Sequence, residues 1–170
     1  QIIHRDVSPQ NVIVGVDGVA RVVDFGIAKA IGRLQDTTQE GRVKGKLTYM
    51  APEQLVRGRT VDHRCDVWAS AVVLWEMLAG EPLFTGAADA MQHHVGQSKI
   101  PRPSERGAPA VLDEVVMKGL ALDADERFQS ARELQGALEE WLGQRSLTVT
   151  TSDIADYLRT LFARRIHDRR

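Results

Sequence analysis

The sequence predicts an α+β fold that is mostly helical and contains one small β-hairpin. Near the N-terminus, two short runs rich in β-branched residues flank a turn that contains glycine, which is typical of a hairpin. Beyond a polar loop, apolar residues recur at the spacing of amphipathic helices. With 170 residues, of which 43% are hydrophobic and 26% charged, the chain can form one globular domain with a core.

Charge and cysteine content narrow the classes of partner. Lys and Arg total 22 against 23 Asp and Glu, and the net charge of -1 gives no electrostatic basis for binding nucleic acid or an anionic membrane. Cys65 is the only cysteine and has no neighbours at metal-site spacing, so we expect a buried thiol and a reducing, cytoplasmic setting. No apolar run is long enough to cross a bilayer, and the first residues do not resemble a signal peptide, so the chain is expected to begin inside a domain.

The predicted hairpin comprises residues 11–14 and 20–23, joined by a turn at residues 15–18 that contains two glycines. The following segment, residues 26–46, is polar and has no sustained apolar period. It is therefore expected to be a long loop, and long loops in compact domains are often functional.

The central element is predicted to be a buried helix. Apolar residues in segment 67–79 recur at helical spacing and wrap most of the way round, and Gly80 marks the expected end. Segment 87–94 predicts a second helix, and segment 111–120 predicts an amphipathic helix beyond a pair of prolines.

The last part of the chain predicts two further helices. Ser130 and Glu133 have the spacing of a capping box, in which the hydroxyl and the carboxylate each accept from the other's backbone N–H. We assign residues 1–142 to the main unit and residues 143–170 to a connector and an amphipathic helix starting near Ser152. This final helix is expected to dock as an appendage, and membrane attachment is the alternative. Its apolar face consists of Ile154, Leu158, Leu161, Phe162 and Ile166.

Three short motifs carry a resemblance to a known family. They are HRDVSPQN at residues 4–11, DFG at residues 24–26 and APE at residues 51–53. Their order, with a hairpin between the first two, resembles the catalytic loop, DFG motif and APE motif of protein kinases. The resemblance implies the large, C-terminal lobe of a bacterial eukaryotic-like serine/threonine protein kinase, in which the hairpin carries the catalytic and metal-binding loops. Such an enzyme transfers the γ-phosphoryl group of ATP, with Mg²⁺, to a protein substrate.

The resemblance also implies the catalytic and cofactor-binding residues. Asp6 matches the aspartate that accepts or orients the proton of the substrate hydroxyl, a role worth roughly a hundred- to ten-thousand-fold in rate. Asn11 and Asp24 match the ligands of Mg²⁺ bound with ATP, because they offer hard oxygen atoms. Each of these residues alone would be interpreted as a turn residue, and only their joint spacing favours the catalytic interpretation.

A regulatory role is implied for the arginine beside the catalytic aspartate. Arg5 resembles the arginine that receives a phosphorylated residue of the activation loop and orders that loop. Thr37 and Thr38 are the candidate phosphorylation sites, and the alternative is that both are only polar loop residues.

Structural roles are implied for three further residues. Glu53 and Arg127 resemble the APE glutamate and its arginine partner on a later segment, and Asp66 resembles the aspartate that holds the backbone of the catalytic loop. These residues are expected to support the site without taking part in the chemistry.

One pair of positions departs from the family pattern. Ser8 stands where serine/threonine kinases usually have a lysine that neutralises the transferring phosphate, and Lys46 stands where they usually have a threonine that bonds this lysine. We hypothesise that the two functional groups have exchanged places, so that Lys46 reaches the phosphate and Ser8 provides the hydroxyl. The alternative is a solvated loop lysine.

The sequence contains no G-x-G-x-x-G loop, no V-A-I-K strand and no helix carrying the partner glutamate, which the family places upstream of the catalytic loop. The N-terminal lobe is therefore expected to be missing, and the chain alone is expected to bind ATP poorly and to be inactive. A non-catalytic pseudokinase or scaffold module and a truncated gene remnant are the alternatives. The presence of Asp6, Asn11 and Asp24 favours the enzyme.

Overall fold

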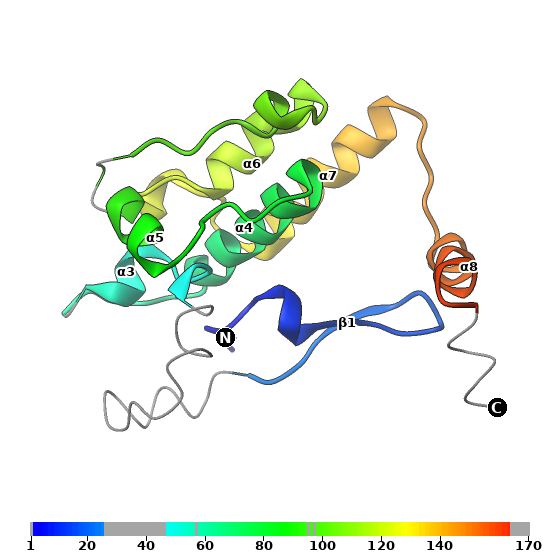
Figure 1. Ribbon diagram of the computed structural model, residues 1–170, viewed down its shortest axis with the longest axis horizontal. Helices are drawn as coiled ribbons and strands as arrows, with labels where there is room; N and C mark the ends of the chain where they lie inside the picture. The colour runs from blue at the N-terminus through cyan, green and yellow to red at the C-terminus, as the bar shows by residue number, and fades with distance from the viewer. Residues whose placement is uncertain (1, 26–46, 57, 95, 97, 164–170) are drawn as a thin grey trace.

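Helices predominate in the part of the chain that the structure describes, and one of them runs through its centre (Figure 1). The computed structural model describes residues 2–25, 47–56, 58–94, 96 and 98–163. Its strands are β1 (Val12–Val14) and β2 (Ala20–Val22), and its α-helices are α3 (Pro52–Leu55), α4 (Arg64–Ala79), α5 (Ala87–His94), α6 (Asp113–Gly119), α7 (Ala131–Gln144) and α8 (Thr151–Leu161). Short 3-10 helices occur at η1 (Pro9–Asn11), η2 (Pro103–Arg106), η3 (Ala110–Leu112) and η4 (Ala124–Glu126).

The hairpin forms as predicted. Strands β1 and β2 pair antiparallel, with Val12 opposite Val22. The N–H of Val23 donates to the carbonyl of Asn11 at 2.8 Å, which extends the pairing to the base of the hairpin. The turn requires a glycine at position 18, because its φ of 76° lies in the left-handed region. The predicted loop at residues 26–46 lies outside the described residues.

Helix α4 is the predicted central helix, and its burial follows from apolar residues on most of its faces. Gly80 ends it with a φ of 72°, and the N–H of Gly80 donates to the carbonyl of Glu76 at 2.8 Å. Cys65 is buried, as expected. The buried residues of α4 are Cys65, Val67, Trp68, Ala69, Ala71, Val72 and Trp75.

Helices α6 and α7 cover α4 from two directions. Gly119 of α6 lies so close to α4 that a Cβ atom at this position would be 2.6 Å from the Cβ of Ala71. On another face, Val67 of α4 packs with Phe128 and with Leu134 of α7 in a second buried cluster. The single helix therefore supplies the core for both neighbours.

Two helix starts differ in detail from the sequence prediction. The helix predicted from residue 111 begins with the 3-10 turn η3, and α6 starts only at Asp113, whose carboxylate accepts from the N–H and the hydroxyl of Ser104. At α7, the hydroxyl of Ser130 accepts from the N–H of Glu133, as predicted. The carboxylate of Glu133 accepts instead from the N–H of Gln129, one residue before the expected donor. Helix α7 also continues to Gln144, into the segment expected to be connector.

Helix α8 lies against the tip of the hairpin (Figure 1). Thr150 and Asp153 form a capping box at its start. Ala155 is its buried residue, and the backbone of α8 closely approaches Gly18 of the turn. Within the described residues, no helix has the length and apolar character needed to cross a membrane.

Candidate active site

The candidate active site is built on a catalytic loop that the central helix holds by its backbone. The carboxylate of Asp66, in the first turn of α4, accepts from the N–H of His4 and from the N–H of Arg5, each at 2.8 Å. A carboxylate that accepts backbone N–H groups forms charge-assisted bonds, which are stronger than neutral ones. The position of the loop is therefore linked to the core through one side chain.

The buried ring of His4 connects the catalytic loop to the hairpin and to the DFG segment. Its Nδ1 accepts from the N–H of Asp6 at 3.3 Å, so Nε2 holds the proton and donates to the carbonyl of Val23 at 3.0 Å. The centre of the His4 ring also lies 4.7 Å from the centre of the Phe25 ring. Sequence analysis gave this histidine no separate role.

Asp6 and Asn11 are brought into direct contact. The Nδ2 of Asn11 donates to the backbone carbonyl of Asp6 at 2.7 Å and lies 3.3 Å from the Asp6 carboxylate. Because Nδ2 is used in this way, Oδ1 of Asn11 is the atom that can bind a metal ion. Asn11 is buried, so its orientation is fixed by these contacts.

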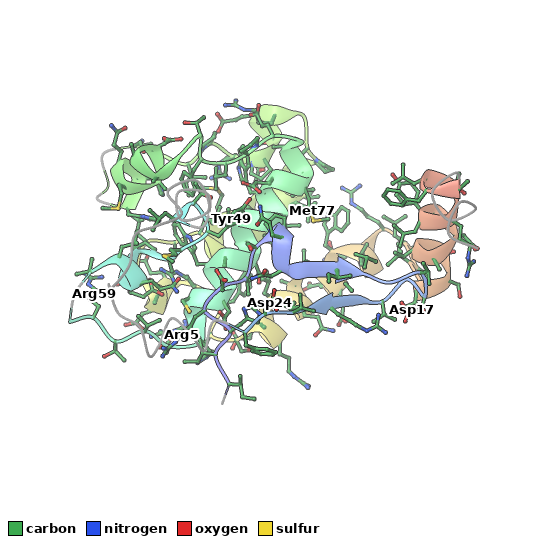
Figure 2. The ribbon with its side chains drawn as sticks, turned by 60° about the horizontal axis from the view of Figure 1, so that its bottom comes forward. Arg5, Asp17, Asp24, Tyr49, Arg59 and Met77 are labelled. Atoms are coloured by element: carbon green, nitrogen blue, oxygen red, sulfur yellow. The ribbon has the colours of Figure 1, made fainter. Side chains whose placement is uncertain are left out.

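Asp24 lies beside this pair because the hairpin brings it there. It directly follows Val23, which pairs with Asn11 at the base of the hairpin, and Figure 2 shows Asp24 near this base, whereas Asp17 is at the tip. Its φ of 59° is left-handed, a region that few residues with a side chain adopt, although aspartate does so more often than most. Such a conformation is found where a structure imposes a particular direction on a side chain.

The oxygen atoms of Asn11 and Asp24 fit the coordination chemistry of Mg²⁺. This ion prefers hard oxygen ligands and binds through one or two carboxylates together with substrate phosphates and waters. Among the residues that the structure describes, no group of three or more His, Cys, Asp and Glu side chains could hold a metal ion.

Ser8 is placed in the interior of the loop. It occupies the N-cap position of η1 and is 1% exposed, but its Oγ has no hydrogen-bond partner among the described residues. A buried hydroxyl without a partner is costly, so this atom marks a position where a further polar group would be accommodated. Lys46, Thr37 and Thr38 lie outside the described residues.

Glu53 and Arg127 form a buried ion pair. The two guanidinium nitrogens Nη1 and Nη2 donate to the two carboxylate oxygens at 2.8 and 2.9 Å. Further bonds from Arg127 to the backbone join α3 to the start of α4 and to the segment before η4. Its guanidinium also lies 5.0 Å from the ring centre of Trp68. The pair thus holds the APE segment on the core.

Sequence analysis missed two residues that support this region. Gln54 bonds both to the N–H of Ala51 and to the carbonyl of Arg5, and Glu76 accepts from the hydroxyl of Tyr49 and from the N–H of Leu83. Burial and the Glu76 carboxylate raise the pKa of Tyr49 above its usual range. Of the two, only Gln54 could have been found from the sequence. It lies three residues after Ala51, which precedes α3, and a side chain at this spacing can cap a helix.

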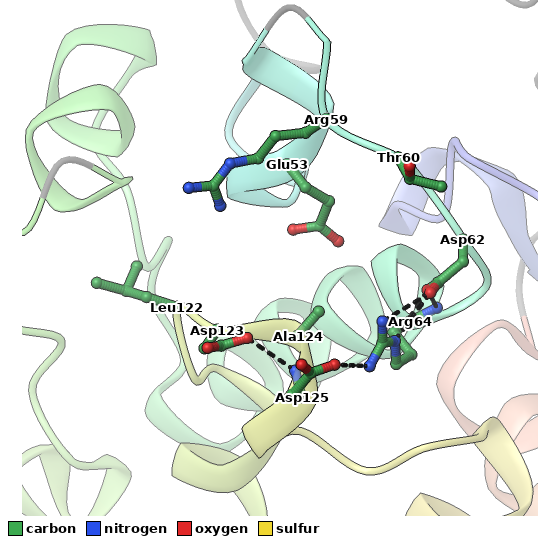
Figure 3. Close-up of a pocket in the computed structure, with 9 residues that line it drawn as sticks. All are labelled: Glu53, Arg59, Thr60, Asp62, Arg64, Leu122, Asp123, Ala124 and Asp125. Carbon is green, nitrogen blue, oxygen red and sulfur yellow. Dashed lines mark hydrogen bonds and ion pairs between the residues drawn. The ribbon is translucent and has the colours of Figure 1, made fainter.

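A polar pocket of about 210 Å³ lies beside the Glu53 carboxylate (Figure 3). Neither Asp6 nor the proposed metal ligands line it. The carboxylates around it are mostly engaged already, since Asp62 and Asp125 both pair with Arg64. The lining residues are Glu53, Arg59, Thr60, Asp62, Arg64, Leu122, Asp123, Ala124 and Asp125.

Comparison with known sequences identifies the family. Residues 1–165 match the family described as protein kinase domain, and the chain therefore belongs to the protein kinase family. The predicted resemblance is confirmed, and so is the fold class, since the described residues are mostly helical and form one two-stranded antiparallel sheet.

Among curated proteins, the chain is similar to bacterial kinases. Serine/threonine-protein kinase PknB of Mycobacterium leprae is 43% identical over 141 residues, and PknB of Mycobacterium tuberculosis is 44% identical over 142 residues. Tyrosine-protein kinase MasK of Myxococcus xanthus is 38% identical over 146 residues. The alignments cover 81% of this chain for the two PknB proteins and 84% for MasK. The chain spans 22% of the length of each of these relatives.

Proposed function

We propose that the protein transfers the γ-phosphoryl group of ATP to serine or threonine hydroxyls of a protein substrate, and that this chain supplies the catalytic loop and the metal ligands. The observation that carries the proposal is the contact between Asp6 and Asn11 on a loop whose backbone is bonded to Asp66. Phosphoryl transfer depends on positioning and on charge stabilisation, and this arrangement provides the positioning.

In the proposed reaction, the Asp6 carboxylate accepts the proton of the attacking hydroxyl. The bonds from Nδ2 of Asn11 hold the backbone and the carboxylate of Asp6, and Oδ1 of Asn11 is the atom that would bind the metal ion. Asp24 would provide the second metal ligand from the other chain segment at the base of the hairpin, directly after Val23. Bound Mg²⁺ would neutralise charge on the ATP phosphates.

Lys46 would provide the positive charge that is missing at position 8 of the catalytic loop. Ser8 replaces the usual lysine, and its buried Oγ can serve as the hydrogen-bond partner of the Lys46 ammonium group. Two unit charges about 4 Å apart interact by roughly 4 kcal/mol at an effective dielectric constant near 20, so a cation here matters for the rate.

Arg5 is the proposed receiver of a phosphate on Thr37 or Thr38. The backbone of Arg5 is held by Asp66. A charge-assisted bond between the Arg5 guanidinium and the new phosphate would therefore attach the activation segment to a fixed position on the catalytic loop. Replacing both threonines with alanine should abolish activation by autophosphorylation, as measured by mass spectrometry and initial rates.

The 170 residues contain no glycine-rich loop and no V-A-I-K strand, so the proposed enzyme needs further polypeptide to cover ATP. An ATP-dependent reaction fits the cytoplasmic setting expected from the single cysteine.

The test is phosphate transfer from labelled ATP to a protein substrate by the full-length protein. Asp6→Asn should lower kcat by roughly a hundred- to ten-thousand-fold, and Lys46→Met should abolish transfer while leaving thermal unfolding unchanged. Asp156→Asn and Lys99→Met are matched controls, because both residues are exposed and remote from the loop. Full activity of Lys46→Met would exclude the proposed exchange with Ser8.

Two other functions would give different results in the same experiment. Since MasK is named a tyrosine-protein kinase, phosphoamino acid analysis of the product decides between serine or threonine and tyrosine. A non-catalytic binding module would transfer no phosphate, and Mg-ATP would not raise the melting temperature of the full-length protein.

A further inference from the structure

We propose that Gln54 is a positioning residue that connects the end of the APE segment to the peptide group in front of the catalytic aspartate. The proposal rests on the proposed function, since it assigns Gln54 a role in placing Asp6. The backbone N–H and carbonyl groups of Arg5 and Asp6 are partly buried, and backbone groups that are shielded from water need hydrogen-bond partners.

All of these backbone groups have a partner, and the partners come from different parts of the chain. The N–H of Arg5 donates to Asp66, and the N–H of Asp6 donates to the ring of His4. The carbonyl of Asp6 accepts from Asn11, and the carbonyl of Arg5 accepts from Nε2 of Gln54 at 3.3 Å. Only Gln54 comes from the APE side of the site.

Arg5 has an unfavourable backbone conformation that its contacts must hold in place. With a φ of 63°, Arg5 is in the left-handed region, which is unfavourable for a residue with a side chain. In the peptide group between Arg5 and Asp6, the carbonyl oxygen accepts from Gln54 and the N–H donates to His4, so both polar atoms of the group are held. A fixed peptide plane limits the directions that the Asp6 side chain can take.

The other end of the Gln54 amide is held as well. Its Oε1 accepts from the N–H of Ala51 at 2.9 Å, and Ala51 is completely buried in the core. Glu53, the adjacent residue, is fixed by Arg127. The amide of Gln54 is therefore oriented by a rigid segment, and a displacement of this segment would be transmitted to the catalytic loop.

Two substitutions separate the two bonds of Gln54. Gln54→Glu keeps the length of the side chain and an oxygen for the N–H of Ala51, but it removes the donor to Arg5. Gln54→Met keeps the length and removes both bonds. Gln135→Met is the matched control, because Gln135 is an exposed glutamine of α7 whose amide bonds only to Glu139.

The measurement on the 170-residue chain is amide hydrogen exchange by NMR, together with thermal unfolding. In both Gln54 variants, the amide of Asp6 should exchange roughly three- to tenfold faster, as expected when one hydrogen bond is lost. The backbone amide of Ala51, whose N–H donates to Oε1 of Gln54, should exchange faster only in Gln54→Met, and the amides of α4 should remain unchanged in both variants. An Asp6 amide that exchanges at the wild-type rate in folded Gln54→Glu would overturn the proposal.

A second measurement separates positioning from structural support. In the full-length protein, Gln54→Glu should lower kcat by roughly three- to tenfold while KM for ATP stays at the wild-type value. An unchanged kcat together with faster exchange at Asp6 would also overturn the positioning role. If the wild-type protein transfers no phosphate, the proposed function fails, and the exchange data still decide whether Gln54 holds the loop.

Discussion

Arg127 has the most complete set of contacts of any side chain described above. A guanidinium group has five N–H donors, and those of Arg127 are used by Glu53 and by three backbone carbonyls. Its side chain is fully buried. A lysine has a single charged nitrogen and cannot reproduce this planar set of bonds.

Removing one partner of this ion pair should strongly destabilise the fold. Arg127→Met leaves the Glu53 carboxylate buried without its counter-charge, and such changes cost about 3–5 kcal/mol. Arg127→Lys should recover only part of this loss. Arg106→Met is the control, because the pair of Arg106 with Glu81 is exposed and should contribute at most about 1 kcal/mol. The measurement is unfolding in urea, and equal losses for Arg106 and Arg127 would contradict the interpretation.

His94 lies in a cluster of aromatic rings that excludes water from it. Its ring centre is 5.5 Å from that of Trp68 and 6.1 Å from that of Phe84, and both of its buried nitrogens lack hydrogen-bond partners among the described residues. Burial, assisted by the charges of His93 and Arg127 and opposed by Glu53, lowers the pKa of His94 to about 4. Burial also lowers the pKa of His93.

The depressed pKa of His94 predicts a loss of stability in mild acid. The unfolded chain takes up a proton as the pH falls through the ordinary histidine value of 6.5, whereas the folded chain resists it until about 4. Stability is therefore complete above pH 6.5 and falls below it, by on the order of 1 kcal/mol at pH 5 after allowing for solvent screening. His94→Phe should show a smaller decrease in melting temperature between pH 7.5 and 5.0, and an unchanged decrease would contradict this assignment.

At the scale of elements, the contact between α8 and the hairpin depends on small residues. A Cβ atom on Gly18 would lie 1.8 Å from the carbonyl oxygen of Thr151 and 2.9 Å from the backbone nitrogen of Ala155. Ala155 is 4% exposed, whereas Tyr157 on the same helix is 66% exposed. Close backbone contact at this point places the tail helix against the tip of the hairpin that carries Asn11 and Asp24 at its base.

A large side chain at position 155 should displace α8 without unfolding the rest. Ala155→Leu adds volume between α8 and Gly18, so amide exchange in α8 should become faster while the amides of α4 keep their protection. Tyr157→Leu is the control on the exposed face of the same helix. Unchanged exchange of α8 in Ala155→Leu would show that the contact with the hairpin does not hold the helix.

At the scale of the whole molecule, α4 connects the site to the core. Asp66 holds the catalytic loop from the first turn of this helix, and the following turns pack against α6, α7 and the aromatic cluster. Changes in the packing of α4 should therefore affect the site and the global stability together.

The close approach of α4 and α6 provides a test of this connection. Gly119→Val would place carbon atoms within 2.6 Å of the Ala71 Cβ, and overpacking of this kind costs about 1–3 kcal/mol. Gly136→Ala is the control, because nothing lies within 4 Å of a Cβ at this position of α7, and it should stabilise the protein by about 0.4–1 kcal/mol. Thermal unfolding measures both effects, and a neutral Gly119→Val would show that the helices can separate freely.

Local patterns explain why several elements could be predicted. The hairpin, the end of α4 at Gly80 and the bounds of α5 depend on turn chemistry and on apolar spacing within a few residues. The start of α6 could not be predicted in the same way, because it is set by the contact of Asp113 with Ser104. The spacing of Ser130 and Glu133 likewise did not show that the Glu133 carboxylate bonds to the N–H of Gln129.

The sequence by itself determined the family, through motifs whose residues are close together in the chain, and it also determined the hairpin and the central helix. Only the tertiary structure decided which groups hold the catalytic loop. Gln54 is 49 residues from Arg5, and Glu53 is 74 residues from Arg127. Contacts over such separations depend on how the helices pack, and local propensity contains no information on packing. This is why a catalytic role for Asp6 could be proposed from its motif, whereas the bond from Gln54 to Arg5 became visible only in the fold.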